Sequence, residues 1–345
     1  MQGGGARPGG QSRSGSGQRR PSGQGGNRGG QGGNRGGRSH QGGGRSDRGG
    51  DAAPEPVRAP VVARVDRTAD LAEEATAAAN RRKALLLSAT PGVLLGVVLG
   101  AVVAVAGLPL VGVLVLLVVA GAVTAWVWRR SPALVLGALG AVPSSEEEHP
   151  RLHNLVDGLC ATMGLDRPAI WVLASDVPNA LALGRDQKSA TVVVTSGLEE
   201  SLGLVELEGV LAHELVHIKR NDTVLSSVAV VVTVPYAIVR GATAGAESVH
   251  GLVGRGREFS ADERAALVVR YPTGISSALE TMVARDPARG GWPPSGGRVA
   301  ALTRWLWFDP MAASTGESTE GNLDDTRVRA AALTEFSGAR ARTLG

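Results

Sequence analysis

Residues 84–128 form a run of 45 residues without a charged side chain, and this run restricts the fold more than any other feature of the chain. It is too long for a single crossing of a hydrocarbon core about 30 Å thick. Gly107-Leu108-Pro109 divides it into two pieces, each about 20 residues long, which is the length of one membrane-spanning helix. We therefore expect a juxtamembrane helix over residues 66–83, followed by two transmembrane helices with a tight turn over residues 84–130.

Basic residues stand at both ends of this hairpin, while its turn carries no charge. The flanking residues are Arg81, Arg82, Lys83, Arg129 and Arg130. The positive-inside rule places both ends, and with them the N-terminus, in the cytoplasm of a multi-pass plasma-membrane protein. Gly92, Gly96 and Gly100 recur at GxxxG spacing, which lets a neighbouring helix approach closely, and the second span is the expected neighbour.

The first 65 residues are expected to form a disordered arm. Residues 1–50 hold 21 of the 49 glycines, nine arginines and one acidic residue, a net charge of +8, so they cannot bury a core. Contact with RNA, attraction to anionic lipid and a role as a solvated spacer are the three interpretations of this composition. Because no aromatic side chain for base stacking precedes Trp126, we do not expect nucleic acid as the partner.

Residues 213–217 read His-Glu-Leu-Val-His, which places two imidazoles four residues apart with a carboxylate between them. Apolar residues at helical spacing surround the motif without a proline, so both histidines lie on one helix face. Zinc in a catalytic site takes neutral imidazole nitrogens and one further protein ligand, and keeps a position for water. We expect His213 and His217 to bind one Zn²⁺ per chain with Glu214 as general base; two surface histidines on an ordinary helix are the alternative.

Glu258 and Asp262 also stand four residues apart, on one face of a second predicted helix. Glu258 is expected to be the third metal ligand. Asp262 is expected to accept a hydrogen bond from the free nitrogen of a ligand histidine, which fixes the tautomer of that histidine. The alternative for this pair is a solvated acidic face.

An apolar stretch at residues 223–239 separates the two metal-binding segments and is at the lower length limit for a crossing. His213, His217 and Glu258 must meet on one side of the membrane, so an odd number of crossings between them is excluded. Residues 240–257 are too polar to provide a return span. We expect residues 223–239 to form a helix buried against the protein or dipping into the bilayer, with a pair of spans as the alternative.

Two β-branched runs, residues 169–173 and 190–195, are bounded by turn residues, and residues 179–184 lie between them. They predict a small antiparallel sheet that leads into the metal-binding helix. The expected fold class is mainly α with this small antiparallel sheet, an α+β domain anchored by the N-terminal transmembrane helical hairpin.

Four segments together resemble the HtpX-like membrane zinc metalloproteases, bacterial relatives of the CAAX prenyl endopeptidases. They are residues 178–185 (PNALALGR), 192–197 (VVVTSG), 207–218 (LEGVLAHELVHI) and 257–262 (REFSAD). The resemblance covers residues 81–285. It implies zinc on His213, His217 and Glu258, Glu214 as general base, and endopeptidase action on membrane or misfolded proteins from a cytoplasmic active site. The zinc metallopeptidase domain then occupies residues 131–285, with a helical or irregular extension of it over residues 286–345.

The chain departs from the family pattern in two places. Family members usually carry a histidine near the C-terminal end of the domain that steadies the oxyanion, but the last histidine here is His250. The corresponding stretch, residues 322–329, offers only an arginine, and Arg327 is the candidate transition-state stabiliser. Relatives also tend to have two apolar segments between the zinc motifs, where this chain has one.

The chemistry of these residues predicts hydrolysis of protein or peptide substrates. Zinc lowers the pKa of its bound water toward 7 and polarises the scissile carbonyl, while Glu214 moves the proton of the water to the leaving amine. An extended substrate would pair with an edge of the small sheet, where Asn179, Ala180 and Leu181 are the candidate substrate-binding residues. The alternatives are a zinc-binding membrane scaffold or pseudoprotease, and a membrane tether that binds RNA or anionic lipid through the arm. The sequence makes no prediction of the oligomeric state.

Overall fold

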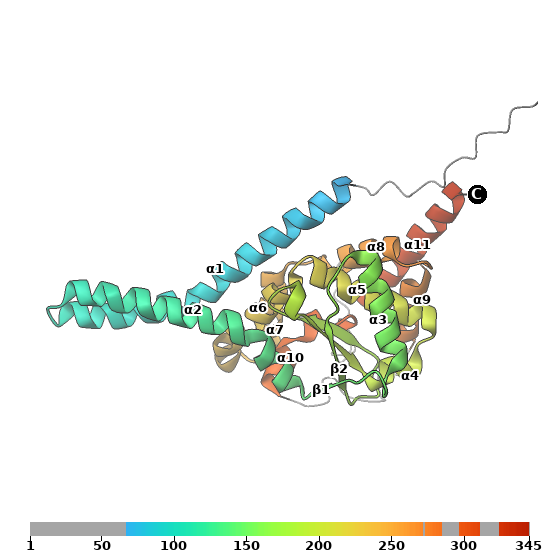
Figure 1. The fold of residues 1–345 in the computed structure, drawn as a ribbon. Helices are drawn as coiled ribbons and strands as arrows, with labels where there is room; N and C mark the ends of the chain where they lie inside the picture. The colour runs from blue at the N-terminus through green and yellow to red at the C-terminus, as the bar shows by residue number, and fades with distance from the viewer. Residues whose placement is uncertain (1–66, 272, 285–296, 311–323, 345) are drawn as a thin grey trace, which may run out of the picture. The chain divides into compact units, whose positions relative to one another are not determined.

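The computed structural model describes residues 67–271, 273–284, 297–310 and 324–344 (Figure 1). The prediction for the arm, residues 1–65, lies outside the described residues. In chain order the helices are α1 (Arg67–Val105), α2 (Pro109–Leu139), α3 (Pro150–Met163), η1 (Gln187–Ser189), α4 (Ser196–Ser201), α5 (Leu204–Lys219), α6 (Asp222–Arg240), α7 (Ala242–Val253), α8 (Arg257–Val268), α9 (Thr273–Val283), α10 (Arg298–Leu302), η3 (Arg304–Leu306) and α11 (Thr326–Leu344), where η1 and η3 are short 3₁₀ helices.

The first two helices form a long antiparallel hairpin, and α1 runs without a break through the predicted juxtamembrane helix and the first span (Figure 1). Gly107 makes the turn with a φ of +92°, a backbone conformation that residues with a side chain rarely adopt. The glycine stripe of α1 faces α2, and a Cβ added to Gly100 would lie only 2.6 Å from the carbonyl oxygen of Gly112. The prediction that this stripe packs against the second span is therefore confirmed.

The outer surface of this hairpin is apolar, as expected for helices in contact with lipid. Both α1 and α2 are long and apolar enough to cross a membrane, and only 22% and 11% of their most apolar windows are buried inside the protein. Large aliphatic side chains such as Leu94, Val98 and Leu114 are exposed along the hairpin. In water such a surface would promote aggregation, whereas in a bilayer it is the normal exterior of a protein.

Helix α6 is also long and apolar enough to cross a membrane, but 61% of its apolar window is buried inside the protein. It packs against α1, α2, α7 and β3. Val224, Val228 and Ala229 belong to a buried cluster that includes side chains of both hairpin helices and of the sheet. This agrees with the expectation of a helix buried against the protein.

One sheet contains the four strands β1 (Val142–Pro143), β2 (Ala169–Leu173), β3 (Ala180–Leu183) and β4 (Thr191–Thr195), in the order β1-β2-β4-β3. Strand β4 is antiparallel to β3 but parallel to β2. The prediction of a small sheet is confirmed, but its description as antiparallel was wrong, because the sheet is mixed. After β2 the chain first forms the edge strand β3 and then turns back. Strand β4 therefore lies between β2 and β3 and runs in the same direction as β2.

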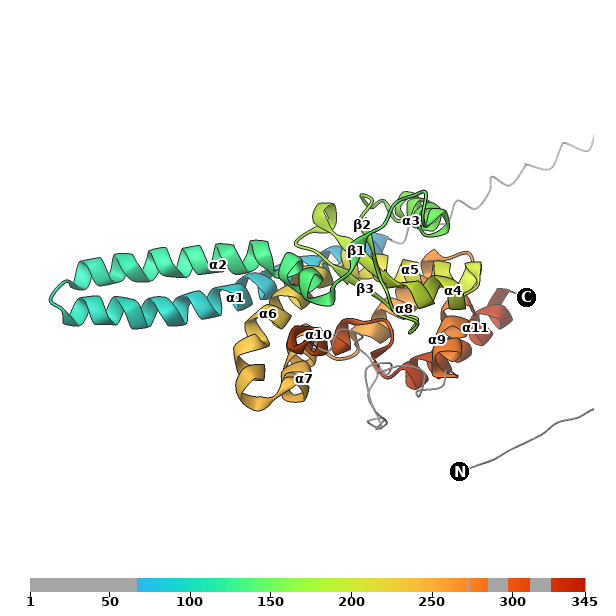
Figure 2. The same cartoon turned by 90° about the horizontal axis from the view of Figure 1, so that it is seen from below.

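Helix α5 lies at the centre of the domain and packs against α3, β3, α8 and α9 (Figure 2). Within residues 207–218 every residue except Glu208 is buried. Helix and sheet residues from both sides of α5 join one continuous hydrophobic core around it. Polar side chains on this helix must therefore be satisfied by one another or by a ligand.

Candidate active site

Helix α5 carries two histidines and a glutamate into the protein interior. It begins after Gly203, whose backbone N–H donates to Oε2 of Glu206 at 2.8 Å and so satisfies one amide at the start of the helix. The exposed fractions of His213, Glu214 and His217 are 0%, 1% and 2%. These side chains are therefore removed from water by the core that surrounds α5.

Three side chains meet at one point, where Glu258 in the first turn of α8 reaches the two histidines of α5. Its Oε2 lies 2.9 Å from Nε2 of His213 and 3.3 Å from Nε2 of His217. The two Nε2 atoms are 3.0 Å apart. Ligands at 2.0–2.1 Å from one tetrahedral ion lie about 3.3 Å from one another, so this spacing suits a single metal ion.

Asp262, one turn after Glu258, contacts His213 on its other nitrogen. Oδ1 of Asp262 lies 2.7 Å from Nδ1 of His213. Arg329 of α11 donates to Oδ1 and Oδ2 of the same carboxylate at 2.9 and 2.6 Å, and neither Arg329 nor Asp262 is exposed. Burial alone would raise the pKa of Asp262, but the charge and hydrogen bonds of Arg329 outweigh burial and lower that pKa. Asp262 is therefore held as an anion behind His213.

His217 has a corresponding partner that the sequence analysis did not identify. Its Nδ1 lies 2.8 Å from Oδ2 of Asp222, the first residue of α6. Oδ1 of Asp222 in turn accepts a hydrogen bond from Nδ2 of Asn80 on α1 at 2.5 Å. Asp222 follows His217 by only five residues, so its position in the sequence was a usable signal. Asn80 precedes Asp222 by 142 residues and gave no such signal.

Glu258 is held in place by groups around the start of α8. Nη2 of Arg257 donates to Oε1 of Glu258, which leaves Oε2 for the cluster, and Nη1 of Arg257 donates to Oγ of Ser226 at 3.1 Å. The backbone N–H of Glu258 donates to Oδ1 of Asp324 at 3.1 Å. Burial would raise the pKa of Glu258, but the neighbouring charges of Arg257 and His217 hold that pKa well below its usual value.

Glu214 differs from the other acidic residues of the site because no described residue pairs with its carboxylate. Both oxygens are buried, and neither has a hydrogen-bond partner within the described part of the chain. Burial raises the pKa of Glu214 above its usual value. A buried carboxylate without a partner is costly, and such groups concentrate where proton transfer takes place.

The structure places the candidate substrate-binding residues at the edge strand β3, and all of them are buried: Asn179, Ala180 and Leu181. The Asn179 side chain accepts from the N–H of Asp309 and donates to its carbonyl oxygen, both at 2.9 Å. The carbonyl oxygen of Ala180 accepts from the N–H of Phe308 at 2.8 Å. The start of this edge is thus covered by the segment of residues 308–309, and the ring of Phe308 stands edge-on to His213, with centroids 4.8 Å apart.

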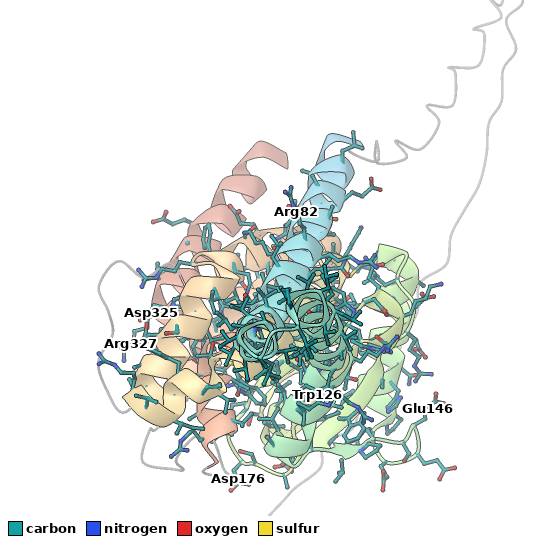
Figure 3. All side chains as sticks on the ribbon, turned by 90° about the vertical axis from the view of Figure 1, so that its left-hand side faces the viewer. Arg82, Trp126, Glu146, Asp176, Asp325 and Arg327 are labelled. Atoms are coloured by element: carbon teal, nitrogen blue, oxygen red, sulfur yellow. The ribbon has the colours of Figure 1, made fainter. Side chains whose placement is uncertain are left out.

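The structure does not bring Arg327 to the cluster. Its side chain is exposed and points outward near the start of α11 (Figure 3). The arginine of this stretch that reaches the site is Arg329, on the opposite side of the helix, and it contacts Asp262. Arg329 therefore acts through another residue and positions the site.

Comparisons with known proteins agree with this geometry. Residues 146–306 match the model of peptidase family M48. The chain is 34% identical over 232 residues to the Protease HtpX homolog of Dictyoglomus thermophilum, which covers 59% of this chain and 77% of that protein. It is 37% identical over 178 residues to the Protease HtpX homolog 2 of Methanosarcina mazei, which covers 43% of this chain and 60% of that protein.

No solved structure matched the chain. The relatives confirm the resemblance drawn from the four sequence segments, and the two exposed apolar helices agree with a membrane location. The chain belongs to peptidase family M48, among the membrane metalloproteases of the HtpX type.

Proposed function

We propose that the chain is a membrane-bound, zinc-dependent endopeptidase in which His213, His217 and Glu258 hold one Zn²⁺ and Glu214 is the general base. The observation that carries this proposal is the buried carboxylate of Glu214, which has no hydrogen-bond partner among the described residues, next to three atoms that could hold a metal ion. A structural carboxylate would be paired within the protein, whereas a general base needs free oxygens for the proton that it moves.

The donor set fits zinc. Two imidazole nitrogens and one carboxylate oxygen form a common ligand set of catalytic zinc sites. Each histidine has Nδ1 against a carboxylate, that of Asp262 or Asp222, and this directs the lone pair of Nε2 toward the metal position. When bound, zinc would polarise the scissile carbonyl and make water more acidic.

Glu214 moves the proton during cleavage. Burial raises its pKa, so the carboxylate is a stronger base than that of an exposed glutamate. It takes a proton from the attacking water and delivers it to the nitrogen of the leaving amine. The peptide bond is thereby divided into a carboxyl group and an amine, and Glu214 returns to its ionised state.

We propose that an extended segment of a membrane or misfolded protein pairs with β3 beyond the part that residues 308–309 cover. Alternate residues of an edge strand direct their backbone N–H and C=O groups to the same side. The carbonyl oxygen of Ala180 points away from β4, so the backbone N–H and C=O of Ala182 do the same. The change Ala182→Pro removes this outward N–H without removing a hydrogen bond to β4. We expect slower cleavage with unchanged zinc content, and unchanged cleavage would exclude this edge as the substrate site.

We also propose that the catalytic unit lies in the cytoplasm, at the plasma membrane. The basic flanks of the hairpin lie near the end of α1 that contacts the catalytic helices, as in the ion pair of Glu73 with Arg264 at 2.7 Å. The turn between α1 and α2 lies at the other end (Figure 2). A reporter inserted at Gly107 should be accessible from outside the cell, and access from the cytoplasm alone would contradict this orientation.

The central test compares zinc content and cleavage of unfolded casein in four purified full-length chains. Glu214→Gln should keep one zinc per chain and lose cleavage by about 10²- to 10⁴-fold, the usual contribution of a general base. Glu258→Ala should lose both zinc and cleavage. The matched control is Glu208→Gln, six residues earlier on α5 and outside the cluster, which should change neither.

The outcomes separate the competing functions. Zinc without cleavage in the unaltered chain would favour a scaffold or pseudoprotease. Full cleavage by Glu214→Gln would remove Glu214 as the base, and full zinc content in Glu258→Ala would remove Glu258 as a ligand. A tether that acts through the arm predicts instead that deletion of residues 1–50 abolishes function while Glu214→Gln does not.

A further inference from the structure

A groove of about 1020 Å³ lies between α1 and α2, at the end of the hairpin that carries the basic residues. Small residues such as Ala89, Ala120 and Gly121 line it together with larger apolar residues such as Leu85 and Val93. A Cβ added to Gly121 would meet no atom within 4 Å, so the groove is open at that point. We call this feature the α1–α2 groove.

The α1–α2 groove has the size and polarity of a site for a long apolar ligand. Its volume is at the upper end of the range of about 300–1,000 Å³ for small-molecule sites. Thr124 is the one hydroxyl on its wall, and Oγ1 of Thr124 donates to the carbonyl oxygen of Ala120 at 2.6 Å. From Leu85 to Val93 the groove follows α1 for about 12 Å, most of the depth of one hydrocarbon leaflet.

Three arginines stand at the charged end of the groove: Arg81, Arg82 and Arg129. None of them has an ion pair with a described residue, and Glu74 is the one acidic residue that lines the groove there. Figure 3 shows Arg82 on α1. Two nearby basic residues, Lys219 and Arg264, do have an acidic partner, because both form ion pairs with the buried Glu73. The charged end of the groove therefore has an excess of positive charge that the described residues do not neutralise.

We propose that the α1–α2 groove binds one anionic phospholipid of the surrounding membrane. The phosphate of the headgroup would contact the three arginines, and one acyl chain would lie on the small residues between Leu85 and Val93. Basic pockets beside membrane helices recognise anionic headgroups in this way. The adjoining exterior of both helices is apolar and exposed, so a membrane lipid reaches the groove by lateral diffusion. Lipid binding at this surface does not depend on the proposed proteolysis.

The test is retention of lipid by the full chain, purified from nanodiscs and observed by native mass spectrometry. Nanodiscs of phosphatidylglycerol and of phosphatidylcholine are compared. The unaltered chain should retain one phosphatidylglycerol and little phosphatidylcholine. Each basic residue near an anionic surface contributes roughly a fivefold factor, so replacing all three arginines by glutamine should lower retention about 100-fold.

Matched variants separate the groove from general surface charge. A triple change of Lys83, Arg130 and Arg240 to glutamine removes the same charge outside the groove lining, and should lower retention much less than the change of the three groove arginines. Replacement of the three groove arginines by lysine should restore much of the retention. Gly121→Trp should fill the groove and displace the lipid, whereas Gly137→Trp, at another open position on α2, should not.

Several results would overturn the proposal. These are equal retention of phosphatidylcholine, equal loss in the control triple variant, and retention that survives Gly121→Trp. A lipid-free dimer whose interface is broken by Gly121→Trp would instead assign the groove to a second copy of the chain. The unfolding midpoint of each variant without lipid distinguishes loss of binding from loss of the fold.

Discussion

Replacing Arg329 by methionine should destabilise the protein and weaken its metal site, while the same change at Arg327 should do neither. Arg329 is fully buried and donates to both oxygens of Asp262, at 2.6 and 2.9 Å, and to the carbonyl oxygen of Phe308 at 2.5 Å. Its guanidinium carbon also lies 4.9 Å from the centre of the Phe308 ring. Methionine fills much of the same space but donates no hydrogen bond, so Asp262 would remain as a buried charge without its cation.

The size of the expected loss of stability follows from the burial of the Arg329–Asp262 ion pair. Removal of one partner from a buried ion pair costs about 3–5 kcal/mol. An unfolding midpoint moves by roughly 2–4 °C per kcal/mol for a domain of this size, so Arg329→Met should lower it by about 6–20 °C. Loss of a group that orients a ligand histidine weakens metal binding about 10- to 100-fold. An exposed substitution such as Arg327→Met changes stability by no more than about 0.5 kcal/mol.

Two measurements on purified protein in detergent check this prediction. Thermal unfolding followed by tryptophan fluorescence, with and without a chelator, gives the stability, and a competition titration gives the zinc dissociation constant. Arg329→Lys should recover part of the stability, because it restores the charge but not the two-pronged contact. A midpoint for Arg329→Met within 2 °C of the unaltered chain, or an equal loss in Arg327→Met, would refute the reasoning.

Two further predictions concern helix packing and the support of His217. Gly209→Ala should destabilise the chain by about 1–3 kcal/mol, because a Cβ there would lie 2.8 Å from Cγ1 and 2.9 Å from the backbone nitrogen of Ile275. Gly158→Ala, at an open position on α3, should stabilise it by about 0.5–1 kcal/mol, and midpoint shifts of the same sign would contradict the packing argument. Asn80→Ala removes a donor to Asp222 and should weaken zinc binding severalfold, less than Asp222→Ala does; the same competition titration measures both, and an unchanged affinity in Asn80→Ala would show that α1 does not support the metal site.

The sequence was sufficient for the parts of the site that depend on the geometry of a single helix. A spacing of four residues brings His213 and His217 to one face of α5, and the same spacing brings Glu258 and Asp262 to one face of α8. In the structure His213, His217 and Glu258 meet at a single point, and Asp262 contacts the other ring nitrogen of His213. The hairpin was predictable for a similar reason, because an uncharged run of this length has few alternatives to two spans.

The parts that the sequence did not supply depend on how separate elements dock. Arg327 and Arg329 are two residues apart, so their side chains point about 200° apart on a helix. Choosing between them requires the rotation of α11 about its axis, which is set by contacts with other helices. The direction of β4 also depends on how separate elements dock, because a β-branched run indicates a strand but does not identify the neighbouring strands. Asn80 was beyond reach too, since a polar residue on the first helix shows no sign of a partner on the sixth.

The pattern of buried charge bears on what the cluster binds. The side chains that contact the three ligands or one another through side-chain atoms, together with Glu214, include these fixed-charge groups, none more than 10% exposed: Glu214, Glu258, Asp262, Asp222, Arg257 and Arg329. Asp324, which accepts from the backbone N–H of Glu258, is counted apart because its other oxygen contacts His250. Four carboxylates against two guanidinium groups leave a formal charge of −2 when Glu214 is ionised. Buried uncompensated charge costs several kcal/mol per ion, and a cation at the three ligand atoms offsets this excess. The same balance explains why Arg257 and Arg329 matter although neither supplies a ligand atom: removal of either one raises the excess to three.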